Sequence, residues 1–263
     1  MLSKSNRDHT HRTRKIVYII PTYNEKENIY KMLCVVEKMF KNLPLYKTAI
    51  LVVDDRSPDG TQTIVRKFQK ENSNVFLLSG PKDGLGKAIS RGIKYAISKL
   101  HADIVVTNEA DFSYSPLRVP TMIRLIENGS DAVFGSRRLI TPEMWPLSRR
   151  IVHFVANTFF AKYIAGITQV DDHNSAFKAI KVGGCLDKVD FTNFPKGYAF
   201  FNYFTFQISK ITPNMSELKT SFHPRTAGES KISFKLKYLK NFLLETFEYI
   251  FVCLRIRFEK TFI

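Results

Sequence analysis

No segment of this 263-residue sequence is an uninterrupted apolar run of about 20 residues, the length that a helix needs to cross a bilayer. Cysteine is scarce: Cys34, Cys185 and Cys253 lie far apart without CxxC spacing, which argues against a disulfide framework and a zinc site. Residues 1–15 lack the apolar core of a secretory signal, and we expect residues 1–14 to form a disordered basic tail. A reducing compartment is the simpler interpretation, and any membrane contact should be at the surface.

Acidic residues are outnumbered, 24 against 40 Lys and Arg, and the formal net charge is +16. This balance favours anionic partners, such as nucleic acid, phospholipid headgroups or phosphorylated substrates. The sequence has no RNP motif, zinc finger or helix-turn-helix signature, so we do not expect nucleic acid to be the partner.

Apolar runs of strand length alternate with amphipathic segments of helix length. The pattern predicts an α/β fold with a mostly parallel central sheet and helices on both faces. The expected strands are Lys15–Pro21, Thr48–Asp55, Val75–Ser79, Asp103–Thr107, Asp131–Gly135, Ser175–Lys181 and an extended piece over Glu217–His223. The expected helices are Glu25–Phe40, Thr61–Gln69, Lys87–Leu100, Ser148–Ile164 and Tyr198–Ile211. We assign a single domain to residues 15–231.

Residues 232–263 mix aromatic and aliphatic side chains with lysine and arginine. In a helix, Asn241, Glu245, Glu248 and Arg255 share one face and leave a broad apolar face opposite. Glutamates make a membrane-spanning helix costly, whereas a helix that lies at the interface keeps them in water. We therefore predict an amphipathic helix that contacts a membrane surface or a partner; packing on its own domain is the alternative.

Carboxylates gather where the predicted strands end. Asp54 and Asp55 follow the second strand, and Glu109 and Asp111 follow the fourth. Ligands of open parallel sheets bind beyond the carboxyl ends of the strands. Clustered carboxylates repel one another unless a cation or hydrogen-bond donors compensate, and a hard cation such as Mg²⁺ or Mn²⁺ prefers oxygen ligands. Capping of the next helix is the alternative role for Asp54 and Asp55.

These segments together resemble the inverting glycosyltransferases of family 2, and within them the dolichol-phosphate (polyprenyl-phosphate) mannosyltransferases. The likeness runs from about Ile16 to Lys231 and rests on an ordered set of motifs: Pro21-Thr22-Tyr23-Asn24-Glu25, Asp54-Asp55 with Ser57-Pro58-Asp59-Gly60-Thr61, Gly84-Leu85-Gly86, Glu109-Ala110-Asp111, Gly135-Ser136-Arg137, Ser175-Ala176-Phe177-Lys178, Lys196-Gly197-Tyr198, and Arg225 with Gly228-Glu229-Ser230-Lys231. The resemblance implies a GT-A (Rossmann-like) fold, a nucleotide-sugar donor, Mg²⁺ or Mn²⁺ as cofactor, and a polyprenyl or dolichyl phosphate acceptor.

The resemblance also implies roles for individual residues. The donor would be bound by Pro21, Tyr23, Glu25, Asp54, Asp55, Lys87, Glu109, Ala110, Asp111, Arg225, Ser230 and Lys231, with Glu109 and Asp111 as the metal ligands. The catalytic set would be Asp111, Arg137, Arg149, Ser175 and Lys178. A phosphate acceptor needs no strong base because it is largely dianionic at neutral pH. A hydroxyl acceptor would need one, and Asp111 or Asp172 would be the candidates.

The sequence departs from the family pattern at several of these positions. Glu109 stands where the family usually has Asp, and Ala176 replaces Gly. Lys178 replaces an Arg, which exchanges a bidentate fork for a point charge. Phe201 and Tyr203 occupy places where Gln and Glu are expected, so recognition of the sugar or the acceptor should differ.

We therefore expect the transfer of a hexose, preferably mannose from GDP-mannose, with inversion to polyprenyl phosphate. The alternatives are glucosyl transfer from UDP-glucose to the same acceptor, and a non-catalytic relative that binds nucleotide or lipid. The expected location is the cytoplasmic face of a membrane, the endoplasmic reticulum in a eukaryote or the plasma membrane in a prokaryote. A small membrane-anchoring subunit is a further partner to consider.

Overall fold

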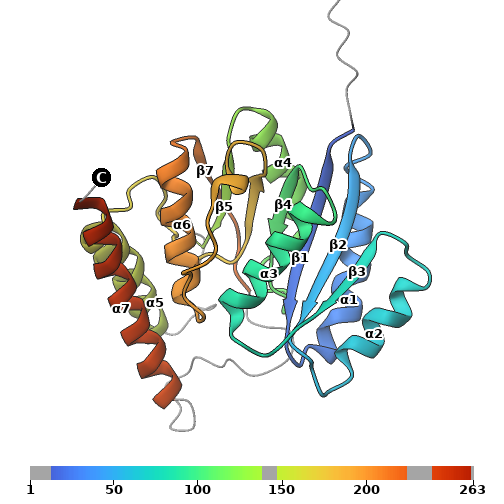
Figure 1. Ribbon diagram of the computed structural model, residues 1–263, viewed down its shortest axis with the longest axis horizontal. Coiled ribbons are helices and arrows are strands. Elements are labelled where there is room, and N and C mark those ends of the chain that lie inside the picture. The colour runs from blue at the N-terminus through green and yellow to red at the C-terminus, as the bar shows by residue number, and fades with distance from the viewer. Residues whose placement is uncertain (1–12, 138–146, 224–238, 262–263) are drawn as a thin grey trace, which may run out of the picture.

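The computed structural model describes residues 13–137, 147–223 and 239–261 (Figure 1). Its centre is a seven-stranded sheet with the strand order β3-β2-β1-β4-β6-β5-β7. All strands are parallel except β6, which is antiparallel to both of its neighbours, β4 and β5. The strands are β1 (Lys15–Thr22), β2 (Lys47–Asp54), β3 (Val75–Ser79), β4 (Ile104–Thr107), β5 (Ala132–Ser136), β6 (Lys178–Lys181) and β7 (Met215–Lys219).

Helices cover both faces of this sheet. Helix α3 packs on β1, β2 and β4 and also contacts α6, while α1 with α2, and α4 further along the sheet, lie on the opposite face (Figure 1). The helices are α1 (Lys26–Phe40), α2 (Thr61–Gln69), α3 (Leu85–Ser98), η1 (Pro116–Arg118), α4 (Val119–Glu127), α5 (Leu147–Phe154), η2 (Val155–Ile164), η3 (Leu186–Lys188), α6 (Ala199–Ile211) and α7 (Leu239–Thr261). This architecture confirms the α/β fold predicted from the apolar runs.

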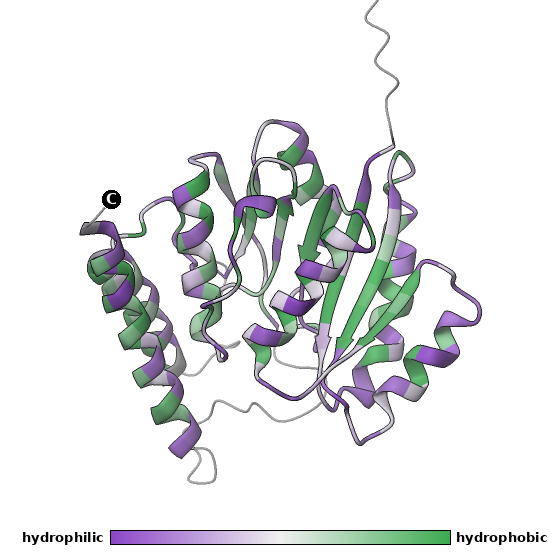
Figure 2. Ribbon diagram, viewed as in Figure 1, coloured by the Kyte–Doolittle hydropathy of each residue, from purple (hydrophilic) through white to green (hydrophobic). Residues whose placement is uncertain are grey.

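The central strands are almost continuously apolar because helices bury both of their faces (Figure 2). Every residue of β1 after Lys15 is buried, and the last six residues of β2 are buried too. Helix α3 approaches the sheet closely at Gly92, where an added Cβ would lie 2.8 Å from Val53 Cγ2. The core therefore holds β1, β2 and α3 in fixed relative positions, and these elements carry the loops described below.

Several elements differ from the sequence expectation. Helix α4 was not predicted; Pro120 lies near its start, where a missing N–H costs no helix hydrogen bond. The helix expected over 148–164 is α5 followed by the π-helix η2. Strand β6 begins only at Lys178, because the Ser175 side chain exchanges hydrogen bonds with the backbone of Phe177 instead.

Helix α7 is the predicted C-terminal amphipathic helix, and it packs against α6 and η2. Val252, Cys253 and Ile256 bury their side chains in this contact, and the Tyr249 hydroxyl donates to the Ala156 carbonyl at 3.0 Å. Among the residues that the structure describes, we find no helix with the length and apolarity needed to span a bilayer.

Candidate functional site

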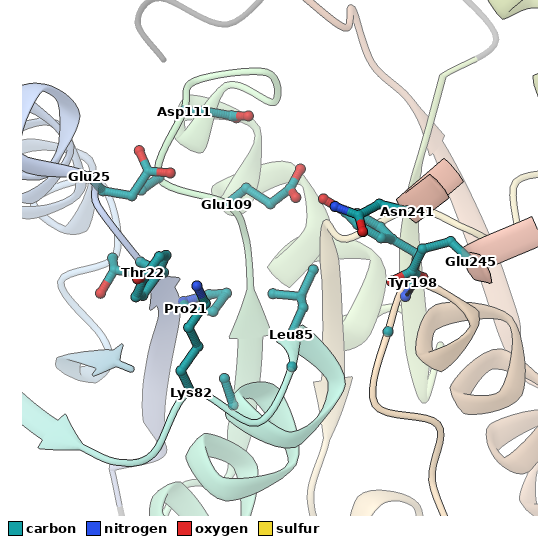
Figure 3. Close-up of a pocket in the computed structure, with 15 residues that line it drawn as sticks. Pro21, Thr22, Glu25, Lys82, Leu85, Glu109, Asp111, Tyr198, Asn241 and Glu245 are labelled. Atoms are coloured by element: carbon teal, nitrogen blue, oxygen red, sulfur yellow. Dashed lines mark hydrogen bonds between the residues drawn. The ribbon is translucent and has the colours of Figure 1, made fainter. Parts of the chain in front are cut away.

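A cavity of about 340 Å³ opens where β1 and β4 end, between the loops that follow these strands and the first turns of α6 and α7 (Figure 3). Parallel strands bring their carboxyl ends to one edge, and Thr22 of β1 pairs in register with Asp54 of β2 there. The cavity is lined by Pro21, Thr22, Tyr23, Glu25, Lys82, Gly84, Leu85, Ala88, Glu109, Ala110, Asp111, Gly197, Tyr198, Asn241 and Glu245.

Two carboxylates enter the middle of the cavity from the loop after β4. Asn108, which is buried, fixes the start of this loop by donating to the Tyr18 hydroxyl at 2.8 Å and accepting from the Glu109 N–H at 2.9 Å. Asp111 is buried and accepts from the Ser113 N–H at 2.9 Å. Glu109 points across the cavity toward α7 (Figure 3).

These two carboxylates fit a divalent cation. Both are oxygen ligands of the kind that Mg²⁺ and Mn²⁺ prefer, and only Ala110 separates them on the loop. No group of three or more His, Cys, Asp or Glu side chains could hold a metal within the described parts of the chain. A cation held by Glu109 and Asp111 would therefore need further oxygen ligands from a bound diphosphate or water.

One end of the cavity combines an aromatic ring, a proline and a cation. The Lys82 ammonium lies 3.8 Å from the centroid of the Tyr23 ring, close enough for a cation–π contact. Pro21 and Glu25 line the same end. A flat apolar surface with polar groups at its rim suits a nucleoside, whose base is planar and whose ribose carries hydroxyls.

Asp54 lies outside this cavity and organises the loop beside it. Its carboxylate is fully buried and accepts from the Thr22 hydroxyl at 2.9 Å, the Ser57 N–H at 2.9 Å and the Gln62 amide at 2.6 Å. The loops after β1 and β2 are further tied by the Asn24 N–H, which donates to the Ser57 hydroxyl at 2.9 Å. This end of the cavity is thus held in shape by hydrogen bonds centred on the buried Asp54 carboxylate.

Gly84 and Gly86 bring the start of α3 against residues 195–197. Gly84 has a φ of +101°, and an added Cβ would lie 2.5 Å from the Lys196 carbonyl oxygen. The Gly86 N–H donates to that same oxygen at 2.7 Å. The glycines therefore do more than ease a turn, because they allow the backbone contact that closes this side of the cavity.

A buried ion pair lies outside the cavity lining, within electrostatic reach of Glu109. Arg137 donates to both carboxylate oxygens of Asp172, through Nε at 2.8 Å and Nη2 at 2.6 Å. Burial acts to raise the pKa of Asp172, but the Arg137 guanidinium overcomes this and holds that pKa well below its usual range. The Glu109 carboxylate contributes to the raised pKa of Arg137, so the cavity and the ion pair share one electrostatic environment.

Lys178 lies next to this pair and is fully buried. Its ammonium donates to the Ser175 carbonyl and lies 5.2 Å from the Phe134 ring centroid and 5.0 Å from that of Phe201. Burial, with the Arg137 charge, lowers the pKa of Lys178 to about 7 although the Asp172 charge opposes this. We name Arg137, Asp172 and Lys178 the basic cluster.

The predicted site residues therefore divide into groups. The cavity brings together Pro21, Tyr23, Glu25, Glu109, Ala110 and Asp111. Its lining does not include Asp54, Asp55, Lys87, Arg137, Ser175 or Lys178, and Asp55 instead pairs with Arg91 at 2.5 Å. Arg225, Ser230 and Lys231 lie outside the described residues, as does the side chain of Arg149, which stands on α5 one turn before His153.

Sequence reasoning missed the opposite wall of the cavity. Asn241 and Glu245 line it from α7, although the sequence had shown only that they share the polar face of a helix. Lys82 was also missed, because nothing in its local sequence distinguishes it from other exposed lysines. Phe201 and Tyr203, the two departures on α6, are buried, and the Tyr203 hydroxyl donates to Glu259 at 2.9 Å and accepts from Arg255 at 2.6 Å.

The sequence is similar to those of known proteins. Residues 18–182 match the model of glycosyl transferase family 2. The chain is 30% identical over 226 residues to the undecaprenyl-phosphate mannosyltransferase of Micrococcus luteus, which covers 83% of this chain and 88% of that protein. It is 29% identical over 233 residues to the dolichol-phosphate mannosyltransferase of Pyrococcus furiosus, covering 86% of this chain and 62% of that one.

The fold also matches a solved structure. The glucosyl-3-phosphoglycerate synthase of Mycobacterium tuberculosis, crystallised with Mn²⁺ and UDP-glucose, superposes with a TM-score of 0.66 at 17% identity, covering 91% of this chain and 79% of that chain. This likeness confirms the predicted GT-A fold. The match over residues 18–182 and the relative at 30% identity show that the chain belongs to glycosyl transferase family 2 and is a glycosyltransferase.

Proposed function

We propose that this enzyme transfers mannose from GDP-mannose, with inversion, to a polyprenyl phosphate such as dolichyl phosphate, and so makes a lipid-linked mannose. The observation that carries the proposal is the order of groups along the site. A nucleoside-shaped end leads to the carboxylates of Glu109 and Asp111, and the basic cluster lies outside the cavity lining, where the charge of Glu109 acts on Arg137. The mannosyl transfer named for two relatives supports the choice of sugar and acceptor.

In this proposal the donor lies along the cavity. Pro21, Tyr23 and Glu25 bind the nucleoside, and Lys82 stacks over Tyr23 to close that end. Glu109 and Asp111 hold Mg²⁺ or Mn²⁺, which when bound neutralises charge on the diphosphate leaving group. The burial of Asp111 and its hydrogen bond from the Ser113 N–H keep the loop in one conformation before the donor arrives.

The acceptor phosphate binds at the basic cluster. The bidentate pair with Asp172 holds the Arg137 guanidinium in place, and Arg149 stands on the neighbouring helix α5. A phosphate monoester has a second pKa of about 6 and is mostly dianionic near neutral pH, so it attacks without a general base. An acceptor oxygen bonds to the anomeric carbon while the bond from that carbon to the diphosphate breaks, and its electron pair leaves with GDP.

Turnover of defined donors tests this function. Purified protein is incubated with GDP-mannose or UDP-glucose, Mn²⁺ or Mg²⁺, and dolichyl or undecaprenyl phosphate, and lipid-linked sugar is measured. We expect product from GDP-mannose, and its loss in Asp111→Ala. Product from UDP-glucose alone would replace mannose by glucose, and no lipid-linked product from any donor would refute the proposal.

We also propose that the enzyme sits on the cytoplasmic face of a membrane, the endoplasmic reticulum in a eukaryote or the plasma membrane in a prokaryote. Helices α5, η2 and α7 expose large apolar side chains, and α7 and η2 are in contact (Figure 1). We name these side chains the apolar surface: Leu147, Ile151, Phe154, Phe159, Tyr163, Leu244, Phe247, Phe251 and Phe258. Phe247 and Phe251 are 68% and 67% exposed, and a solvated patch of this kind marks an interaction site.

Binding to vesicles tests the attachment. Phe247→Ser with Phe251→Ser removes apolar area without touching the core, so co-sedimentation with phosphatidylserine-containing vesicles should fall while the unfolding midpoint stays the same. Leu45→Ser is the matched control and should bind as wild type does, because Leu45 is 82% exposed in the loop between α1 and β2 and does not belong to the apolar surface. Unchanged binding by the double variant would show that the apolar surface does not bind the membrane. It would then bind a protein partner, such as an anchoring subunit, or have no partner.

A further inference from the structure

The wall of the cavity that faces Glu109 comes from the C-terminal helix. Asn241 and Glu245 are one helical turn apart on α7 and line the cavity, together with Gly197 and Tyr198 at the start of α6 (Figure 3). We propose that Asn241 and Glu245 bind hydroxyl groups of the transferred hexose and so help to select the sugar. The inference rests on the proposed function, because it needs a nucleotide-sugar donor in this cavity.

The order of groups in the donor places the hexose at this wall. In a nucleotide sugar the diphosphate lies between the nucleoside and the sugar. Pro21 and Tyr23 define the nucleoside end and Glu109 with Asp111 the diphosphate position, so the sugar occupies the part of the cavity beyond Glu109. The polar side chains that bound this part from α7 are Asn241 and Glu245.

The chemistry of the two side chains suits hydroxyl groups and not phosphates. A carboxylate accepts hydrogen bonds from hydroxyls, and an amide can both donate and accept. A second anionic phosphate near Glu245 would be repelled by that carboxylate and by Glu109 across the cavity. Neutral hydroxyl groups meet no such repulsion, and sugars are recognised through them.

The structure holds Glu245 rigidly against the backbone of α6. Its Oε2 accepts from the Tyr198 N–H at 2.9 Å, and an added Cβ at Gly197 would lie 2.4 Å from the same oxygen. A side chain at position 197 would therefore displace this carboxylate, together with that of Glu248, whose Oε2 would lie 2.6 Å from the same Cβ. Burial raises the pKa of Glu245, with a further contribution from the charge of Glu248, so this carboxylate is less well solvated than one at a free surface.

The departures on α6 agree with this assignment. Phe201 and Tyr203 are 3% and 4% exposed and face the core and α7, so they do not present polar groups to a sugar. Both carboxylate oxygens of Glu245 lie against Gly197, and within the described residues the carboxylate makes a single hydrogen bond to the protein, through Oε2, so it keeps the capacity to accept from a ligand. The sugar end of the cavity therefore takes its polar groups from α7 rather than from α6.

A structural role is the competing explanation, because Glu245 could serve only to cap the start of α6. Comparing a nucleotide with its nucleotide sugar separates the two roles. We would measure the affinities of GDP and GDP-mannose by calorimetry with Mn²⁺, in wild type and in Glu245→Gln, Asn241→Ala and Glu259→Gln. Glu259 is the matched control, since it is a carboxylate on the same helix that contacts Tyr203 and Arg255 and does not line the cavity.

We expect Glu245→Gln to weaken GDP-mannose binding about 10- to 100-fold, the effect of losing a hydrogen bond to a charged group, while GDP binding changes less than about twofold. Asn241→Ala removes an exposed side chain, should fold normally, and should give the same selective loss at about 5- to 10-fold. Glu259→Gln should match wild type for both ligands.

Equal losses for GDP and GDP-mannose, or no loss in either cavity variant, would overturn the inference. If wild type turns over UDP-glucose instead, the same comparison is made with UDP and UDP-glucose. The sugar contacts are then tested even if the proposed donor is wrong. A wild type that turns over no donor would overturn the proposed function and this inference with it.

Discussion

Replacing Lys178 by methionine should change how the stability of the enzyme depends on pH. In the folded protein the ammonium is fully buried, and its pKa is lowered from 10.5 to about 7. In the unfolded chain the same lysine has its ordinary pKa. Between about pH 7 and pH 10 the unfolded state therefore binds one more proton than the folded state, which favours unfolding as the pH is lowered.

The size of the effect follows from this difference in bound protons. A difference of one proton changes the free energy of unfolding by about 1.4 kcal/mol per pH unit, and partial protonation near the folded pKa reduces this to about 1 kcal/mol per unit between pH 7 and pH 9. The sign is fixed: wild type gains stability from this group as the pH rises. Lys178→Met removes the titrating group, so the stability of wild type relative to the variant should rise by about 2 kcal/mol across that range.

Urea unfolding at pH 7, 8 and 9, followed by fluorescence, measures these free energies. The variant also loses the hydrogen bond to the Ser175 carbonyl. That loss shifts the stability of the variant by the same amount at every pH, so the difference in slope between the two proteins remains. Lys181→Met is the control on the same strand, because the Lys181 ammonium is partly exposed and pairs with Asp131 at 3.1 Å. Parallel profiles for wild type and Lys178→Met would refute the reasoning and show that Lys178 stays charged when buried.

Two other substitutions test the framework around the site. Asp172→Asn leaves the Arg137 guanidinium buried without its carboxylate and should lower the free energy of unfolding by about 3 kcal/mol in urea titrations, whereas Asp171→Asn, at a more exposed ion pair, should cost less than about 1 kcal/mol. Gly84→Ala combines a positive φ with a Cβ clash against the Lys196 carbonyl, so it should lower stability by more than about 2 kcal/mol and weaken nucleotide binding in calorimetry.

Gly60→Ala is the control for the glycine substitution. Gly60 has a similar φ of +94°, but no atom lies within 4 Å of its added Cβ. The extra loss of Gly84→Ala over Gly60→Ala therefore measures the contact with Lys196 together with the backbone strain from ψ, which is 155° at Gly84 and 8° at Gly60. Equal losses of stability in the two glycine variants would show that this contact is unimportant. For the ion pair, an Asp172→Asn variant as stable as Asp171→Asn would mean that the pair contributes nothing to folding.

Much of the sheet could be predicted because its strands are buried on both faces. Runs such as Lys15–Pro21 are typical of a strand buried in a parallel sheet under helices. The antiparallel direction of β6 could not be predicted, since its four residues carry no signal of direction and their partners β4 and β5 are distant in sequence. The π-helix η2 also depends on tertiary contacts, among them the Asn157 side chain, which accepts from the His173 N–H at 3.0 Å.

Part of the cavity lining was predictable, namely the residues that follow directly from a strand. Glu109 and Asp111 come after β4, and Pro21 and Tyr23 close β1, so topology alone brings them to one edge. Asp54 has the same sequence context, yet its carboxylate turns inward because Ser57 and Gln62 offer it donors. Sequence position fixes where a side chain starts, but the neighbours it meets decide whether it faces a ligand.

Helix α7 has a practical consequence for anyone who handles this enzyme. One side of the helix forms part of the cavity through Glu245, and Phe247, two residues along the chain, is exposed to the surroundings. Detergent or lipid bound to the outer side of α7 therefore contacts the same helix that borders the cavity. Kinetic constants should therefore be compared only when they were measured in the same detergent or lipid.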